Sequence, residues 1–296
     1  MLKQSFAKEE ISIIDCTLRD GGYYTDWLFK DSLINSYLKA CDSTSIKVCE
    51  IGLRQKPNIK RFLGPCAFTS ESFLQSLVIP SNLYVSVLVN ASDIIGNEKN
   101  PNEIISELFP LPANESRVNI IRIASSILEL EKLEEITDYL FNYGYFITIN
   151  LLKCHILDEI KIHKVSRILE RIKFDVLYIA DSLGCCFPED ISRIVKNLLA
   201  ICKMPIGIHS HDNKGLALAN TLSAMNAGAT FLDSTILGMG RGAGNTKTEE
   251  LLPIVSNRNI EDYLYLSEYI KEYQEPLKRD KKWGNSIYYS ISSTFK

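Results

Sequence analysis

Short apolar runs recur along the chain, and segments with a longer repeat lie between them. Each run is rich in β-branched residues and reads as a continuous apolar strand rather than an alternating one, which is typical of strands in a parallel sheet covered on both faces. Eight runs predict strands in this way, over residues 11–15, 47–51, 84–89, 120–124, 146–151, 176–181, 206–211 and 230–234.

The segments between the runs repeat apolar residues at helical spacing. Pro188 and the two acids after it favour a helix start, Gly228 favours a helix end, and Pro276 favours the end of the last helix. Helices are predicted over residues 127–142, 156–172, 190–202, 213–227 and 260–274.

The regular alternation of these two patterns predicts the fold class. Eight strand–helix units in about 250 residues are typical of a closed (β/α)₈ TIM barrel, an α/β fold. An open doubly wound sheet is the alternative. We expect residues 1–256 to form the barrel, and residues 257–296 to form a short C-terminal extension that is helical and aromatic.

Composition and charge exclude several kinds of partner. Hydrophobic residues make up 46% of the chain and charged residues 23%, which suits a globular protein. The net charge is −3 and the densest basic run, 278–282, contains an acid, so we expect no nucleic-acid partner. No apolar run reaches the ~18 residues of a membrane span, and no signal peptide is evident, so we expect no membrane partner. The eight cysteines lack C-x-x-C spacing, which favours free thiols and a cytoplasmic location.

Polar side chains gather where the predicted strands end. In a TIM barrel the carboxyl ends of the strands carry the active site. The residues placed there are Arg19, Asp20, Glu50, Arg54, Arg122, Asp181, Ser182, His209, His211 and Asn245.

His209 and His211 are two residues apart on a predicted strand, so their imidazoles point the same way. Such a pair can bind a divalent cation, with Asp212 as a partner that orients one ring. The alternative is a pair of hydrogen-bonded core histidines. Asp20 leaves a strand two places away around a closed barrel, so its carboxylate can complete the site. Taken alone, Asp20 also fits a turn residue in D-G-G, and Arg19 fits a surface ion pair.

Glycines alternate with other residues over 238–245, in the sequence GMGRGAGN. The spacing differs from that of dinucleotide-binding loops, and the segment follows the last predicted strand rather than the first. We interpret it as a tight loop that brings its backbone and Asn245 up to the site.

Three motifs in this order, DCTLRDGG, HSHDN and GMGRGAGN, give residues 11–252 a resemblance to a known family. The chain resembles the DRE-type TIM-barrel metallolyases, or HMG-CoA-lyase-like family, and among them most of all the 4-hydroxy-2-oxovalerate aldolases. The resemblance implies a divalent cation, Mn²⁺ before Mg²⁺, held by Asp20, His209 and His211 with Asn245 on or near it. It also implies that Arg19 stabilises an enolate. Glu50, Arg122, Asp181 and Ser182 are the candidate substrate-binding residues.

The activity that the resemblance implies is a metal-dependent carbon–carbon lyase that acts on a 2-oxo acid such as pyruvate and on an aldehyde. A base must remove the proton of the 4-hydroxyl group. The aldolases have a histidine shortly after the D-G pair, whereas this chain has Tyr23, whose usual pKa of about 10 makes it a poor base. Either Tyr23 is helped by the metal or Arg19, or another group or a water acts, or the substrate differs.

Two other functions stay open. One is a Claisen-type acyl-CoA synthase or lyase of the same superfamily, although the synthases have G-E-R where this chain has G-R-G. The other is a non-catalytic barrel that binds metal. The aldehyde dehydrogenase partner of the aldolases is not expected, because the segment after Asn245 is short. The stretch WGNSIYYSIS either covers the barrel mouth or contacts a second copy in a homodimer.

Overall fold

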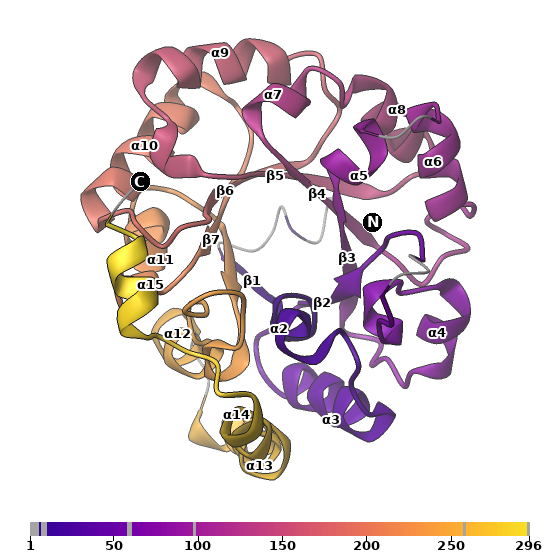
Figure 1. Cartoon of the computed structure of the whole chain (residues 1–296), viewed down its shortest axis with the longest axis vertical. Coiled ribbons are helices and arrows are strands. Elements are labelled where there is room, and N and C mark those ends of the chain that lie inside the picture. Colours follow the sequence, from indigo (N-terminus) through magenta and orange to yellow (C-terminus); the bar gives the residue numbers. More distant parts are fainter. Residues whose placement is uncertain (1–5, 7–10, 58–60, 97–98, 257–258, 295–296) are drawn as a thin grey trace.

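Eight parallel strands close into one barrel, in chain order, with β8 paired to β1 (Figure 1). The computed structural model describes residues 6, 11–57, 61–96, 99–256 and 259–294. The closed ring confirms the predicted TIM barrel and excludes the open sheet. The strands are β1 (Ser12–Asp15), β2 (Val48–Leu53), β3 (Tyr84–Asn90), β4 (Ile120–Ser125), β5 (Phe146–Leu151), β6 (Val176–Asp181), β7 (Ile206–Ser210) and β8 (Phe231–Ser234).

Burial along the strands explains their sequence pattern. Every residue of β1, β2 and β4–β8 is buried, because one face of each strand packs in the barrel and the other lies under helices. The strands β2, β3 and β4 run one or two residues past their predicted ends, and β7 stops at Ser210, one residue early.

Helices form the outer ring of the barrel (Figure 1). Those that follow the strands are α3 (Asp31–Asp42), α4 (Glu71–Ser76), α5 (Ala91–Ile95), α6 (Pro101–Leu108), α7 (Ile127–Leu130), α8 (Glu134–Asn142), α9 (Glu159–Leu169), α10 (Pro188–Ile201), α11 (Ala217–Asn226) and α12 (Thr248–Val255). Short 3₁₀ turns lie at η1 (Pro65–Ala67), η2 (Cys154–Ile156) and η3 (Ile236–Gly238).

The single helix predicted over 127–142 is in fact two, α7 and α8. A capping box between Ser126 and Glu129 begins the first, which ends after one turn. The backbone then turns, and Leu130 and Leu133 are both fully buried there. The apolar residues keep helical spacing on both sides of this break, so their spacing alone predicted one helix instead of two.

The segment after β1, expected to be a loop, is the helix α2 (Thr17–Thr25). Two consecutive glycines disfavour a helix by propensity. Packing reverses this preference, because a Cβ on Gly21 would overlap Met239 and one on Gly22 would overlap the Trp27 indole. The helix forms because its glycines let it pack this closely.

The chain beyond α12 continues as η4 (Ile260–Tyr263), α13 (Leu264–Tyr269), η5 (Ile270–Gln274), α14 (Glu275–Lys281) and α15 (Ile287–Ser292). Pro276 does not end a helix, as predicted, but lies in the first turn of α14 after the wide π-helical turn η5, where its missing N–H is not needed. Tyr269 packs on Tyr37 of α3, at 6.0 Å between ring centroids. The expected domain boundary at 256 adjoins residues 257–258, outside the described ones, and stays a prediction.

The aromatic segment near the C-terminus lies beside the barrel mouth. The indole of Trp283 is buried and donates a hydrogen bond to the carbonyl of Leu237, at 3.0 Å. Tyr24 of α2 lies 6.4 Å from the Trp283 ring and donates a hydrogen bond to the carbonyl of Gly242. This placement agrees with a cover for the mouth, while the expected homodimer stays a prediction. Within the described residues, no helix has the length and apolar character needed to cross a membrane.

The opposite end of the barrel is closed by one aromatic side chain. The ring of Phe6 is buried, and its centroid lies 5.2–5.6 Å from those of Tyr84, Phe146 and Phe231. Because these partners come from β3, β5 and β8, Phe6 links strands around the barrel.

Replacing Phe6 with alanine should lower the free energy of unfolding by about 3–5 kcal/mol, because it removes a buried ring and leaves a cavity among the strands. Equilibrium denaturation in urea measures this. Phe62→Ala is the matched control, since the Phe62 side chain is 80% exposed and should change stability little. Equal effects of the two substitutions would contradict the role given to Phe6.

Candidate active site

The carboxyl ends of the strands surround a cavity of about 220 Å³. Strand β7 and helix α2 contribute most of its charged wall. The predicted site residues that line it are Arg19, Asp20, Tyr23, Ser182, His209 and His211. The structure thus brings together side chains that are far apart in the sequence.

Asp20, His209 and His211 form a compact buried group. Nε2 of His209 lies 3.6 Å from Oδ2 of Asp20, and the two imidazole centroids are 5.1 Å apart. One ligand atom from each of the three residues lies within 4.8 Å of the others. The alternative of two ordinary core histidines does not explain why both imidazoles face a carboxylate at a cavity wall.

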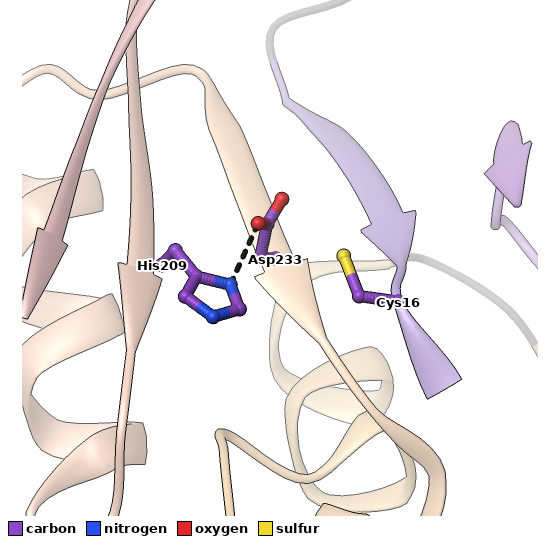
Figure 2. Close-up of side chains that lie close together, drawn as sticks. All are labelled: Cys16, His209 and Asp233. Atoms are coloured by element: carbon purple, nitrogen blue, oxygen red, sulfur yellow. Dashed lines mark hydrogen bonds and ion pairs between the residues drawn. The ribbon is translucent and has the colours of Figure 1, made fainter. Parts of the chain in front are cut away.

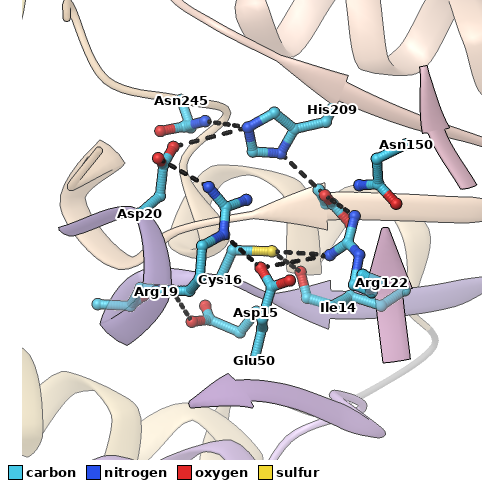
Figure 3. Close-up of polar contacts among 12 residues, drawn as sticks. Ile14, Asp15, Cys16, Arg19, Asp20, Glu50, Arg122, Asn150, His209 and Asn245 are labelled. Atoms are coloured by element: carbon cyan, nitrogen blue, oxygen red, sulfur yellow. Dashed lines mark hydrogen bonds and ion pairs between the residues drawn. The ribbon is translucent and has the colours of Figure 1, made fainter. Parts of the chain in front are cut away.

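Asn245 joins this group through the glycine-rich loop (Figure 3). Its Nδ2 lies 3.0 Å from Nε2 of His209. The loop approaches so closely that a Cβ on Gly240 would overlap Oδ1 of Asn245 and touch Asp20. Only glycine permits this approach, so the loop serves to seat Asn245, as its sequence suggested.

Electrostatics keep Asp20 and His211 ready to accept a cation, whereas Asp20 and Asp233 outweigh burial and raise the pKa of His209, so a bound cation would displace a proton there. Burial raises the pKa of Asp20, but the nearby Arg19 and His209 outweigh burial and hold that pKa well below its usual range. Burial lowers the pKa of His211 to about 3, so its ring is neutral and offers a lone pair. An ionised carboxylate and a neutral imidazole are both metal ligands.

The residues present fit a divalent metal ion. Oδ2 of Asp20 and Oδ1 of Asn245 are buried and make no hydrogen bond within the described residues. A buried acceptor without a partner is costly, and a cation bound between these oxygens and the imidazoles would satisfy both. Carboxylate, amide and imidazole groups are all ligands of divalent metal ions.

Asp233 of β8 orients His209, a role that the sequence analysis gave to Asp212 (Figure 2). Oδ2 of Asp233 lies 2.8 Å from Nδ1 of His209, which leaves Nε2 turned toward Asp20. Asp212 instead accepts a hydrogen bond from the backbone N–H of Ala217 at the start of α11, so that expectation was wrong. Nδ1 of His211 lies 3.1 Å from the carbonyl of Arg241. Each ring nitrogen that faces away from the cavity thus has its own partner.

Cys16, His209 and Asp233 also lie close enough to one another to suggest a second metal group (Figure 2). Arg122 opposes it, because Nη2 donates to Oδ2 of Asp233 at 2.6 Å and Nη1 lies 3.2 Å from the sulfur of Cys16. A fixed guanidinium between the ligands repels a cation. The charges therefore favour the group around Asp20.

Glu50 and Arg122 lie beneath the cavity rather than in its wall (Figure 3). Oε2 of Glu50 accepts a hydrogen bond from Nε of Arg19 at 2.7 Å and lies 3.5 Å from Nη1 of Arg122. The guanidinium of Arg122 also stacks over the Tyr178 ring, at 4.3 Å. Both side chains contact other residues of the site and neither lines the cavity, which does not fit the expected direct contact with substrate.

Asp181 and Ser182 are neighbours in the sequence, but their side chains have different contacts. The two carboxylate oxygens of Asp181 accept hydrogen bonds from the backbone N–H groups of Cys185 and Cys186, so Asp181 holds the loop after β6 instead of facing the cavity. Ser182 does line the cavity, and its Oγ accepts from the N–H of Lys153. Arg54, also placed at the strand ends, points outward and pairs with Glu71.

Comparisons with known proteins identify the family. The sequence model of the HMGL-like family matches residues 116–273, more than half of the chain. The chain belongs to the HMGL-like family. A 4-hydroxy-2-oxovalerate aldolase of Pelotomaculum thermopropionicum is 29% identical over 248 residues, which cover 83% of this chain and 70% of that protein. An oxaloacetate decarboxylase of Mycobacterium tuberculosis is 27% identical over 261 residues, which cover 87% of this chain and 73% of the decarboxylase.

Two solved structures are similar to this HMGL-like chain. The N-terminal domain of a Bacteroides vulgatus protein assigned as an aldolase has a TM-score of 0.85 and 30% sequence identity, with 96% of this chain and 92% of that domain covered. An HMG-CoA lyase of Bacillus subtilis has a TM-score of 0.70 at 17% identity, with 95% of this chain and 97% of the lyase covered. The second likeness extends to the fold alone.

Tyr23 departs from the histidine that the resemblance led us to expect in an HMGL-like aldolase. Its ring lines the cavity and meets Trp27 edge-on, at 4.7 Å between centroids. Burial raises the pKa of Tyr23, and the positive charge of Arg19 does not outweigh this. The hydroxyl therefore keeps its proton and is a donor rather than a base near neutral pH.

Four residues of this HMGL-like site were missed in the sequence. Three of them could have been found as polar residues inside or at the end of an apolar strand. The fourth could have been found as a charged residue inside the glycine-rich loop. Their side chains line the cavity or hold its ligands: Asn90, Asn150, Asp233 and Arg241.

Asp233→Asn should weaken the binding of Mn²⁺ about 10–100-fold, because the carboxylate that fixes the orientation and basicity of His209 is lost. Calorimetric titration measures the affinity, and circular dichroism checks that the variant is folded. Asp212→Asn is the matched control beside His211 and should bind Mn²⁺ like the wild type, since asparagine can still cap α11. Unchanged affinity in a folded Asp233→Asn protein would refute the role of Asp233.

Proposed function

We propose that this HMGL-like protein is a divalent-metal-dependent lyase that forms or cleaves a carbon–carbon bond beside the enolate of a 2-oxo acid, with pyruvate as the simplest acid. The observation that carries the proposal is the carboxylate of Asp20. Its Oδ1 is bonded to Nη1 of Arg19 at 2.8 Å, while Oδ2 faces the imidazoles of His209 and His211 without a hydrogen-bond partner in the described residues. One residue thus links a cation site to a fixed positive charge.

The names of the relatives support an enolate as the common intermediate. A 4-hydroxy-2-oxovalerate aldolase and an oxaloacetate decarboxylase both release a 2-oxo acid after a carbon–carbon bond beside its methyl carbon is broken. Breaking either bond leaves the electron pair on the same carbon. A site that stabilises this enolate accounts for both relatives, and no feature of the cavity favours an acyl-CoA thioester.

Arg19 is placed to stabilise the enolate. Nε and Nη1 are held by Glu50 and Asp20, and Nη2 has no partner within the described residues, so it is free to donate to an oxygen in the cavity. When bound, a divalent ion supplies Lewis acidity toward the 2-oxo and carboxylate oxygens of the acid. Arg19 would supply a preorganised donor to the oxygen that gains charge.

Tyr23 suits the condensation direction. As the enolate carbon bonds to the aldehyde carbon, the aldehyde oxygen becomes an alkoxide that needs a proton. A tyrosine whose raised pKa keeps it protonated can donate a hydrogen bond to this oxygen, and the proton then comes from Tyr23 or from water at the open mouth. In the cleavage direction the same hydroxyl is a poor base, so a water takes that role.

Exchange of the pyruvate methyl protons with deuterium should depend on added Mn²⁺ or Mg²⁺, because the enolate would form at the proposed site when a water in the cavity takes a methyl proton, which needs no aldehyde. Nuclear magnetic resonance of pyruvate, recorded after the ion is removed, measures it. Asp20→Ala and His209→Ala should abolish both metal binding and exchange. Exchange that persists in a chelator, or that is absent in the metal-loaded wild type, would contradict the proposal.

Arg19→Ala should leave the metal bound but lower the rate of exchange about 10²–10³-fold, as is usual for the loss of one preorganised donor. The metal content and the exchange rate are measured on the same sample. Arg61→Ala is the matched control, because Arg61 forms an exposed ion pair with Asp26 away from the cavity. A near-normal exchange rate in Arg19→Ala would show that Arg19 does not stabilise the enolate.

A further inference from the structure

The cavity wall away from Asp20 is unusually polar for a site that receives a small alkyl aldehyde. Ligand pockets are mostly apolar with few polar groups. Here Asn90, Asn150, Ser182 and Arg241 line the cavity in addition to the candidate metal ligands. These four side chains come from different strand ends, so the polarity surrounds the space that the second substrate would occupy.

Asn150 offers a buried donor to this space (Figure 3). Its side chain is 3% exposed, and its Oδ1 accepts a hydrogen bond from the Thr148 hydroxyl at 2.9 Å. Nδ2 makes no hydrogen bond within the described residues. An amide donor at a cavity wall can bind a polar group of a substrate, and an alkyl chain offers it none.

A second cavity, of about 340 Å³, adjoins the first at Asn90, which lines both. Its wall includes Arg54, Gln55, Lys56, Ser92 and Asp93, and the two cations are paired with acids beside the cavity, Arg54 with Glu71 and Lys56 with Glu107. Nδ2 of Asn90 donates to Oδ2 of Asp93 at 2.9 Å. The two cavities therefore form one polar path from the candidate metal site to the end of β3 and the start of α5.

We propose that the second substrate is a polyhydroxylated aldehyde, whose carbonyl reacts beside Arg19 and whose hydroxyl-bearing tail passes Asn90 toward Asp93. This inference rests on the proposed function and names the substrate class of the same site. In the reaction the enolate carbon bonds to the aldehyde carbon, the carbonyl π pair moves to oxygen, and that oxygen takes a proton.

Hydrogen bonding and charge favour this class over the alternatives. Hydroxyl groups can donate to the Asp93 carboxylate and accept from the Asn150 amide, whereas an alkyl tail offers these groups no hydrogen bond. A tail that ends in phosphate or in the phosphates of coenzyme A would meet the negative charge of Asp93, while Arg54 and Lys56 in the same wall are already paired with Glu71 and Glu107. A neutral tail that carries hydroxyl groups fits both the hydrogen-bonding groups of the cavity wall and the charge of Asp93.

The decisive experiment compares aldehydes of equal carbon number in condensation with pyruvate and Mn²⁺. Glyceraldehyde and erythrose are matched against propanal and butanal, and kcat/KM is measured for each. We expect the hydroxylated aldehydes to be preferred by at least about tenfold, because a site built for hydrogen bonds rejects analogues that lack them.

Two variants test which residues cause the preference for hydroxylated aldehydes. Asn90→Leu should lower the ratio of kcat/KM for erythrose over butanal about tenfold, and Asp93→Ala should lower it for the four-carbon pair more than for the three-carbon pair. Ser192→Ala is the matched control, because Ser192 lines a cavity of about 590 Å³ that shares no lining residue with either cavity of the proposed path. The ratio is taken within each variant, so a general loss of activity does not affect it.

The outcomes separate this inference from the proposed function. Exchange of the pyruvate methyl protons needs no aldehyde, so its absence from the wild type overturns both. If the wild type exchanges these protons but prefers butanal to erythrose, only the inference of a polyhydroxylated tail is overturned. The same holds if the ratio of kcat/KM for erythrose over butanal is unchanged in both Asn90→Leu and Asp93→Ala. A changed ratio in Ser192→Ala would place the tail in the other cavity and would likewise overturn it.

Discussion

A row of buried charges of alternating sign holds the candidate site together. It runs from Asp20 to Arg19, Glu50, Arg122 and Asp233, with successive contacts of 2.8, 2.7, 3.5 and 2.6 Å, and it ends on an imidazole at 2.8 Å. Each member is almost fully buried, so none is compensated by water. Removing any one would leave a neighbour as an unpaired buried charge, which makes the row a constraint on the whole mouth of the barrel.

The row of charges also explains how residues from separate strands are held in fixed positions around the candidate site. Its members come from α2, β2, β4 and β8, and its last contact is on β7. Packing of apolar side chains tolerates small shifts, whereas bidentate and hydrogen-bonded ion pairs have a fixed geometry. The orientation of His209 is thus set by a network that spans half of the barrel, and not by its own strand alone.

The sequence was sufficient for the barrel and for the residues that converge on the candidate metal site. Runs that are apolar on both faces identified all eight strands, and the spacing of His209 and His211 fixed the direction of their rings. The sequence was not sufficient to identify the residues that only position other side chains of the site. Glu50 and Arg122 looked like contacts for a substrate because a sequence shows which charges lie near a strand end but not how deep each one lies. Asp181 was misjudged for the same reason, since backbone N–H groups satisfy both of its oxygens.

Local propensity failed where tertiary contact determined the conformation. The glycines of α2 argued for a loop, but contact with Met239 and Trp27 leaves no room for any other residue and makes the helix possible. Pro276 argued for a helix end, but the π-helical turn before it lets the chain continue. Asp233 resembled an ordinary strand residue, because its imidazole partner is 24 positions away in the chain.

The tight packing of α2 has a consequence for the evolution of this barrel. One side of the mouth, where glycine backbone meets an indole and a thioether, cannot accept a new side chain without moving the groups that hold the charge row. The side near α5, where Ser92 and Asp93 are exposed at the start of that helix, bears no such restriction. Descendants of one ancestor can therefore diversify on the α5 side while the α2 side is inherited almost intact.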